Sequence, residues 1–112
     1  MNILSTTKII KNYFKKFTKK DLEGLRKIFN KNIILIDWDS SEQGIKKVMH
    51  KNKKIFTKFK KIKIKILNIL KKKNLYCIQM KIYINSNIKF FEVVDLITVK
   101  NNKIIKIHAY KC

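Results

Sequence analysis

The first half of the chain places apolar residues at the spacing of amphipathic helices. Residues 6–17 carry Ile, Tyr and Phe on one face, which predicts a first helix. Residues 18–21 have the spacing of a helix cap and open a second helix that ends near Asn30. Turn-forming and cap-forming residues at 39–44 precede a third helix over residues 45–59. We therefore predict three helices.

Strand patterns occupy the rest of the chain. Residues 32–38 form a short, almost wholly apolar run, which is typical of a strand covered on both faces. Apolar and polar residues then alternate in four segments, which predicts a meander of four strands. These segments are residues 61–70, 75–85, 88–100 and 103–109. Asn101 and Asn102 tolerate left-handed turn conformations, so we expect the last two segments to form a hairpin at the centre of the sheet.

This order of elements predicts an α+β fold. We expect three N-terminal helices packed in a strongly curved mixed sheet, which gives a cone-shaped α+β barrel. The chain has 112 residues, of which 46% are hydrophobic, with two glycines and no proline. A chain of this length and composition is expected to form one domain over residues 1–112.

A carboxyl group interrupts the apolar face of the strand predicted at residues 88–100. Alternate positions of a strand share one face, and on this face Asp95 stands between Val93 and Ile97. A charge at a core-facing position is costly unless it is paired, hydrogen-bonded or neutralised by a proton. A lysine partner could neutralise Asp95, but the neighbouring positions of the same face offer none. The pattern favours a chemical role for Asp95 in a pocket.

The net charge of +21 would normally indicate nucleic acid or an anionic membrane as a partner. However, Arg26 is the only arginine, whereas phosphate and base recognition favour the planar guanidinium group. The lysines are spread over every predicted element, and codons rich in A and T explain their abundance equally well. We therefore do not expect nucleic acid as the main partner, and binding of a polyanion is the third hypothesis.

No segment is long and apolar enough for a signal peptide or a membrane span, so we expect a cytoplasmic protein with no membrane partner. Cys77 and Cys112 form neither a metal-ligand spacing nor a disulfide framework. His50 and His108 have no metal-ligand companion. We expect reduced thiols, no metal and no cofactor.

Short motifs over essentially the whole chain resemble the nuclear transport factor 2-like (NTF2-like) superfamily, also called SnoaL-like. These motifs are Tyr13, Asp21-Leu22-Glu23-Gly24-Leu25, Leu35-Ile36-Asp37, Gly44, Val93-Val94-Asp95 and the ending Ala109-Tyr110-Lys111. Among the enzymes of this superfamily, the closest resemblance is to ketosteroid isomerase. The resemblance implies the cone-shaped fold and proton transfer on a hydrophobic carbonyl compound.

In ketosteroid isomerase an aspartate moves a proton on the carbon next to a carbonyl group. A tyrosine and a protonated aspartate donate hydrogen bonds to the enolate oxygen, and the family is a standard example of a carboxylic acid kept neutral by an apolar site. The resemblance implies that Asp37 is the base and that Tyr13 and Asp95 are the donors. The chain departs from the family at Asn52, where the family has a supporting tyrosine, and at Lys111, where it has an aromatic residue.

We expect the pocket to bind a small hydrophobic ligand. The residues predicted to bind this substrate are Phe17, Trp38, Met49, Phe56, Tyr76, Ile78 and Val93. The opposite face of the sheet carries an apolar cluster that is too contiguous for a very basic monomer to leave bare, which predicts a homodimer. This cluster, the outer apolar face, consists of Phe90, Val94, Leu96, His108 and Tyr110.

Plainer interpretations of the same residues remain open. Asp37 precedes further polar residues and could be an ordinary turn or cap residue. Tyr13 could be a packed helix residue with a satisfied hydroxyl group. The alternative function is a non-catalytic superfamily member that binds a small ligand or dimerises. An epoxide hydrolase of this fold would need an arginine between two carboxylates, and Arg26 in the second helix is badly placed for that role.

Overall fold

The computed structural model describes the backbone of residues 3–112 and the side chains from residue 7 onwards. The helices are α1 (Ile3–Thr18), α2 (Leu22–Ile28) and α3 (Ile45–Lys58). The strands are β1 (Phe29–Ile36), β2 (Ser41–Gln43), β3 (Ile62–Lys72), β4 (Leu75–Ile84), β5 (Phe91–Lys100) and β6 (Lys103–Lys111). The three predicted helices and five of these strands are confirmed. No helix among the described residues is long and apolar enough to cross a membrane.

The sequence prediction is wrong in the region before α3. The turn predicted at residues 39–44 contains the short edge strand β2, which pairs antiparallel with β1. Strand β2 is held by backbone hydrogen bonds, and its side chains do not show the alternation of apolar and polar residues from which a strand is predicted. The predicted cap chemistry is also absent, since α3 begins after Gly44, which makes no side-chain cap bond. Gly44 has a φ of 94°, a conformation that favours glycine.

Two further boundaries differ from the prediction. The second helix ends at Ile28 rather than near Asn30, and β1 begins at the next residue. The strand predicted from residue 88 begins at Phe91, because a wider loop connects β4 and β5. In this loop the Ser86 hydroxyl oxygen accepts hydrogen bonds from the backbone N–H groups of Ile88 and Lys89. Such a local bond competes with strand pairing.

The turn between α1 and α2 fixes the end of α3. Lys20 takes a left-handed backbone conformation, with φ 58°, and the N–H of Asp21 donates to the carbonyl oxygen of Lys16, as in a Schellman motif. The Lys20 ammonium group donates to the carbonyl oxygens of Phe56, Phe59 and Lys60. Cations are favourable at this negative end of a helix. This contact ties the first helices to α3.

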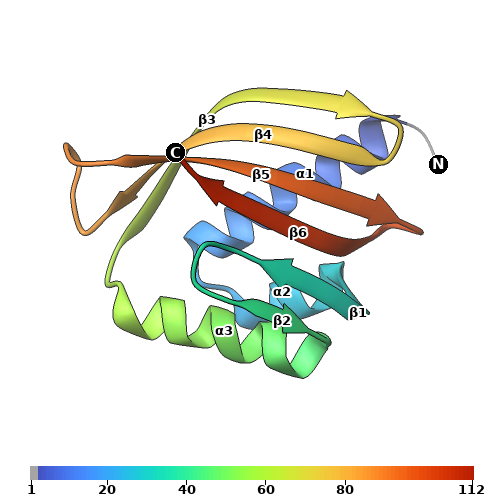
Figure 1. Ribbon diagram of the computed structural model, residues 1–112, viewed down its shortest axis with the longest axis horizontal. Helices are drawn as coiled ribbons and strands as arrows, with labels where there is room; N and C mark the ends of the chain where they lie inside the picture. The colour runs from blue at the N-terminus through green and yellow to red at the C-terminus, as the bar shows by residue number, and fades with distance from the viewer. Residues whose placement is uncertain (1–2) are drawn as a thin grey trace.

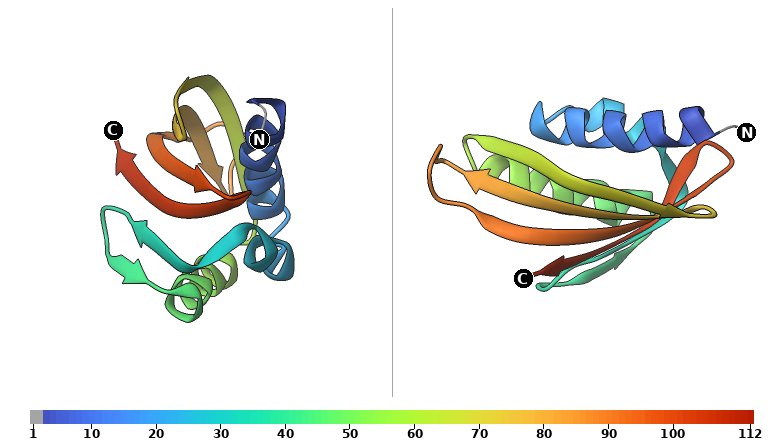
Figure 2. Two further views of the ribbon diagram at one scale, coloured as in Figure 1. Left: turned by 90° about the vertical axis from the view of Figure 1, so that its right-hand side faces the viewer. Right: turned by 90° about the horizontal axis from the view of Figure 1, so that it is seen from above.

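The six strands form one mixed sheet in the order β2-β1-β6-β5-β4-β3. Only β1 and β6 pair in parallel, and the remaining neighbours are antiparallel. The sheet is strongly curved, as Figure 1 and Figure 2 show, and the helices lie on its concave side. Helix α1 contacts β3 and helix α3 contacts β1, so the helices bridge the two halves of the sheet. The result is the predicted cone-shaped α+β fold.

The concave side holds an apolar core with two polar exceptions. Fully buried side chains include Ile10 of α1, Leu25 of α2 and Ile97 of β5. Among the described residues, the only buried side chains that are polar or charged in their usual state, apart from tyrosines, are Asn52 and Asp95. Both lie in the part of the cone that is hollow.

Candidate active site

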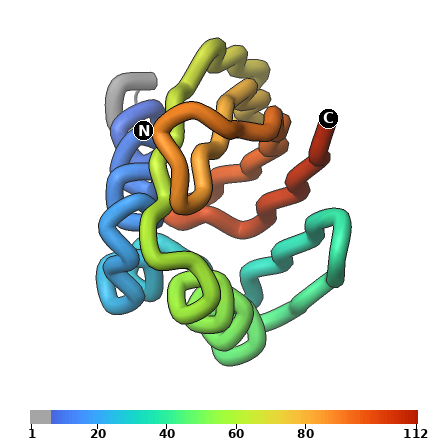
Figure 3. The backbone as a smooth tube through the Cα atoms, turned by 90° about the vertical axis from the view of Figure 1, so that its left-hand side faces the viewer, coloured from blue at the N-terminus to red at the C-terminus, as the bar shows by residue number. Residues whose placement is uncertain are grey.

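A cavity of about 450 Å³ lies inside the cone, a size typical of small-molecule sites. Its walls come from α1, α3 and the inner faces of the curved sheet. The exposed lining residues are Trp38, Asp39, Lys54, Lys58 and Lys111. They belong to the β1–β2 turn, the second half of α3 and the end of β6, which surround one end of the cone in Figure 3. The cavity therefore opens at this end.

Asp95 is placed in the cavity by β5, and burial controls its charge. Its side chain shares a face with Val93 and Ile97, and its cross-strand partners are Ile78 and Ala109. The residue is 6% exposed and forms no ion pair with the residues that the structure describes. Loss of hydration raises the pKa of Asp95 from 3.8 to about 7. No lysine of the described residues pairs with Asp95, as the plainer interpretation would require.

Tyr13 reaches the same cavity from α1. It is 6% exposed, and its ring packs edge-on against Phe14 at a centroid distance of 4.9 Å. Burial raises the pKa of the Tyr13 hydroxyl well above its ordinary value, and the negative charge of nearby Asp95 raises it further. Tyr13 therefore stays protonated and can act as a hydrogen-bond donor.

Asp37 lies at the end of β1 and has several partners. Its Oδ1 accepts hydrogen bonds from the backbone N–H groups of Asp39, at 2.8 Å, and Ser40, at 2.9 Å. Its Oδ2 lies 3.3 Å from Lys51 Nζ, which also donates to Ser40 Oγ at 2.9 Å. Asp37 thus organises the β1–β2 turn, as the plainer interpretation states. It also lines the cavity, close to the mouth.

The structure brings together six of the ten residues predicted for the site. Tyr13, Phe17, Asp37, Trp38, Val93 and Asp95 all line the cavity. The four others, Met49, Phe56, Tyr76 and Ile78, are buried in the core and are not part of the cavity wall. Ile78 pairs directly with Asp95, and Tyr76 lies two residues closer to the β3–β4 turn, where side chains fill the cone. Met80 and Ile82, further along the same face, line the cavity instead.

Sequence reasoning misses the role of two neighbours in α3. Lys51 is one of many lysines, so nothing in the sequence distinguishes it as the partner of Asp37. Asn52 carries a signal, because it interrupts the apolar stripe of α3, and it is only 2% exposed. Its Nδ2 has no hydrogen-bond partner among the described residues. Asn52 also lines the cavity.

The rim of the cavity combines aromatic rings with lysines. Trp38 and Phe91 meet edge to face at a centroid distance of 6.1 Å. Lys111 Nζ lies 4.9 Å from the centroid of Phe91 and 5.8 Å from that of Trp38, within cation–π range. The departure from ketosteroid isomerase at Lys111 thus places an ammonium group at the mouth.

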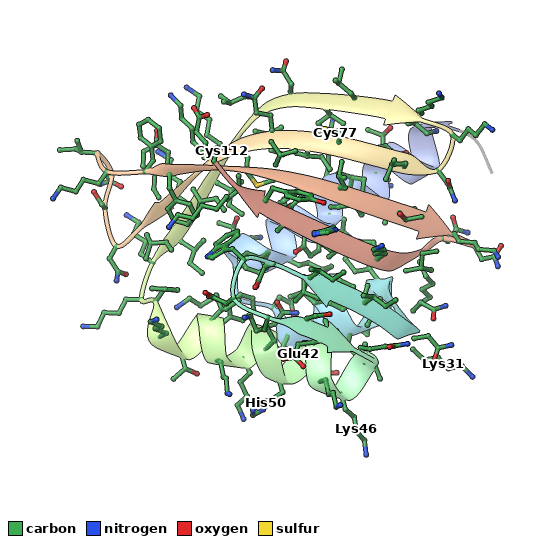
Figure 4. All side chains as sticks on the ribbon, in the orientation of Figure 1. Lys31, Glu42, Lys46, His50, Cys77 and Cys112 are labelled. Carbon is green, nitrogen blue, oxygen red and sulfur yellow. The ribbon has the colours of Figure 1, made fainter. Side chains whose placement is uncertain are left out.

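Histidine and cysteine side chains take no part in this site. His50 projects from the outer side of α3, and Cys77 lies on β4, as Figure 4 shows. Both cysteines are free thiols. Arg26 is exposed on α2, with Nε 3.8 Å from Glu23 Oε1, and does not line the cavity. The site therefore lacks the arginine that epoxide hydrolysis in this fold would need.

Comparisons with solved structures identify the fold. An NTF2-like protein of unknown function from Cytophaga hutchinsonii is 18% identical, with a TM-score of 0.79 over 96% of this chain and 89% of that chain. A candidate ketosteroid isomerase from Kribbella flavida is 8% identical, with a TM-score of 0.83 over 96% and 78%. An LEH-like epoxide hydrolase from M. tuberculosis is 11% identical, with a TM-score of 0.83 over 97% and 84%.

The chain therefore has the fold of the NTF2-like superfamily, which confirms the resemblance seen in its motifs. No family model matches the sequence, and no curated protein matches it. The similar structures include an isomerase candidate and an epoxide hydrolase, so the fold alone does not select a reaction. Any choice between reactions depends on the residues of the cavity.

Proposed function

We propose that this protein is a small acid/base enzyme that moves a proton on a hydrophobic carbonyl compound, as ketosteroid isomerase does. The main support is the environment of Asp95, whose pKa of about 7 allows a neutral carboxylic acid inside the cavity. A neutral carboxyl group donates a hydrogen bond, whereas a carboxylate only accepts. Together with Tyr13, it supplies two donors for one oxygen atom.

In this mechanism Asp37 is the base. The substrate carbonyl oxygen binds near Tyr13 and Asp95, and Asp37 takes a proton from the adjacent carbon. The C–H electron pair forms a carbon–carbon double bond, and the carbonyl π electrons move to the oxygen, which becomes an enolate. The protonated Asp37 then returns the proton to a carbon further along the conjugated system, so that the double bond shifts and the carbonyl group is restored.

The apolar wall supports this chemistry. It excludes water from the enolate, so hydrogen bonds from the two donors are stronger than in solution. Asp37 differs from Asp95 because it lies near the mouth and has the partners of a carboxylate anion: two backbone N–H groups and an ammonium group. The two carboxyl groups thus have different partners, which supports the different roles proposed for them.

A deuterium-exchange experiment tests the proposed function. Wild-type protein in D₂O should catalyse exchange on a panel of bicyclic unsaturated ketones, measured by NMR against the rate in buffer at the same pH. Exchange above the buffer rate on one or more ketones is the expected result. If no ketone of the panel exchanges faster with protein, the non-catalytic alternative replaces the enzymatic one.

That alternative is a ligand-binding protein, and the contacts of Asp37 favour it. A general base needs a free lone pair directed at the substrate, whereas both Asp37 oxygens have partners at the turn or on Lys51. A binding protein would give saturable binding of the ketones in the same experiment without any exchange. The two functions are therefore distinguished by one preparation and one set of compounds.

We also propose a two-fold dimer through the outer apolar face. Phe90 and Tyr110 are 46% and 48% exposed, and the pairs Val94–Tyr110 and Leu96–His108 are cross-strand neighbours on β5 and β6. The ring of His108 stacks on Tyr110 at a centroid distance of 4.3 Å. A contiguous apolar surface of this kind on a very basic protein is expected to be covered.

Sedimentation of wild type and Leu96→Lys at low micromolar concentration measures this assembly. Wild type is expected to sediment as a dimer and Leu96→Lys as a monomer, because a lysine at the centre of the face would bury a charge. Ile88→Lys is the matched control, since Ile88 is 85% exposed in the β4–β5 loop, outside this face. A wild-type monomer of 13.5 kDa, or a dimer that Leu96→Lys leaves intact, would contradict the proposal.

A further inference from the structure

Asn52 occupies a position that the pattern of α3 reserves for an apolar residue. The buried residues of α3 are Val48, Met49, Asn52 and Phe56, at the spacing of one helix face. Asparagine is a poorer helix former than leucine. The Asn52 side chain is 2% exposed, so it has lost its contact with water. A buried amide without a partner is unfavourable, and Asn52 Nδ2 has none among the described residues. An apolar side chain of similar size would avoid both costs.

The place of Asn52 indicates what would offset these costs. It lines the cavity from α3, whereas Tyr13 and Asp95 line it from α1 and β5. Its neighbour Lys51 is already engaged by Asp37 and Ser40. The carboxamide of Asn52 is thus a further polar group of the cavity, on a different wall from the two proposed enolate donors. A polar group that violates the local pattern at a cavity wall is typical of a binding function.

We propose that Asn52 hydrogen-bonds a second oxygen of the ligand, so that the ligand is a hydrophobic compound with two separated oxygen functions. One oxygen is the carbonyl group held by Tyr13 and Asp95, and the other accepts from the Asn52 amide. This inference rests on the proposed function, since it assumes that a carbonyl compound occupies the cavity. A site built around such a bond discriminates against the analogue that lacks the oxygen, because the buried amide is then left unpaired.

A matched pair of probes tests this specificity. One probe is a bicyclic enone of the octalone type, and the other has the same skeleton with a second ketone on the other ring. Trp38 is the only tryptophan and lines the cavity, so its fluorescence reports binding of both. We expect wild type to bind the diketone about ten-fold or more tightly than the enone, the usual effect of one buried hydrogen bond.

The variant Asn52→Leu separates a ligand-binding role from a structural one. It should lose the preference for the diketone, because the hydrogen bond to the second ketone is removed, and keep its affinity for the enone within about three-fold, because the enone has no oxygen for Asn52 to bind. Without ligand it should melt at a higher temperature than wild type, since the unpaired amide is gone. Thr57→Leu, at an exposed position of α3, is the control for the gain in helix propensity alone.

Each result decides between these roles. An Asn52→Leu protein that melts lower than wild type and binds both probes unchanged would show a structural role and overturn the inference. Equal affinities of the two probes for wild type would overturn the inference alone and leave the proposed function intact. If wild type binds neither probe, both the proposed function and this inference fail.

Discussion

Replacing Asp37 by asparagine is expected to lower the turnover of ketone exchange by about a hundred- to ten-thousand-fold, the usual contribution of a positioned acid/base group. Asparagine is nearly isosteric with aspartate but cannot take up a proton at neutral pH. Its Oδ1 can still accept from the N–H groups of Asp39 and Ser40, so the β1–β2 turn is retained. The exchange rate at saturating ketone, measured by NMR in D₂O, gives the change in turnover.

The binding of the ketone separates a chemical defect from a structural one. Trp38 fluorescence should give the same dissociation constant for wild type and Asp37→Asn within about three-fold, because uniform binding is not affected by loss of the base. Asp39→Asn is the matched control, since Asp39 is an exposed carboxylate on the same rim. Full exchange activity in Asp37→Asn would exclude Asp37 as the base.

The fold could be predicted because the residue patterns that specify its helices and strands are local in the sequence. Helical spacing in residues 6–17 and 45–59 and alternation in four later segments define elements whose order permits few packings. The elements that the sequence pattern does not predict are held by backbone contacts. The edge strand β2 pairs with β1 through the main chain, and the cap of α3 depends on the φ angle of Gly44. Neither feature produces a hydrophobic pattern.

Apart from the family resemblance, the residue pattern marks the site most clearly where a residue contradicts its surroundings. Asp95 stands out because a carboxyl group among apolar strand residues is costly, and Asn52 stands out on α3 for the same reason. Lys51 could not be found, because a lysine on a lysine-rich helix carries no such contrast. The shared face predicts Met49 and Tyr76 in the pocket, but one face contains both cavity wall and packed core. The depth of a side chain along the axis of the cone depends on the curvature of the sheet.

Asp95→Asn is expected to change the pH dependence of stability more than any other single substitution in the cavity. The pKa of Asp95 is about 7 in the folded protein, and the ordinary value of 3.8 applies to the unfolded chain. Below about pH 4 the carboxyl group is protonated in both the folded and the unfolded state, so it does not lower the free energy of unfolding. As the pH rises from 4 through 7, the unfolded chain loses the proton first, so wild type becomes progressively less stable.

The size of this loss follows from the two pKa values, since a difference of about three units corresponds to roughly 4 kcal/mol in the free energy of unfolding. The asparagine side chain does not titrate, so Asp95→Asn should gain this amount relative to wild type between pH 4 and pH 8. Other carboxyl groups affect both proteins equally and cancel in the difference. Urea unfolding at several pH values measures it, and Asp39→Asn, which alters an exposed carboxylate, should show no comparable gain.

The same substitution tests the neutral form of Asp95 in the proposed reaction. Wild-type exchange should decline as the pH rises above about 7, because Asp95 then loses the proton that it donates to the enolate oxygen. An asparagine amide donates at every pH, so Asp95→Asn should keep much of the rate and lose this decline. If the stability difference between the two proteins does not vary with pH, Asp95 is not a buried acid that titrates near neutrality. If both proteins decline alike above pH 7, another group limits the reaction and Asp95 is not the donor.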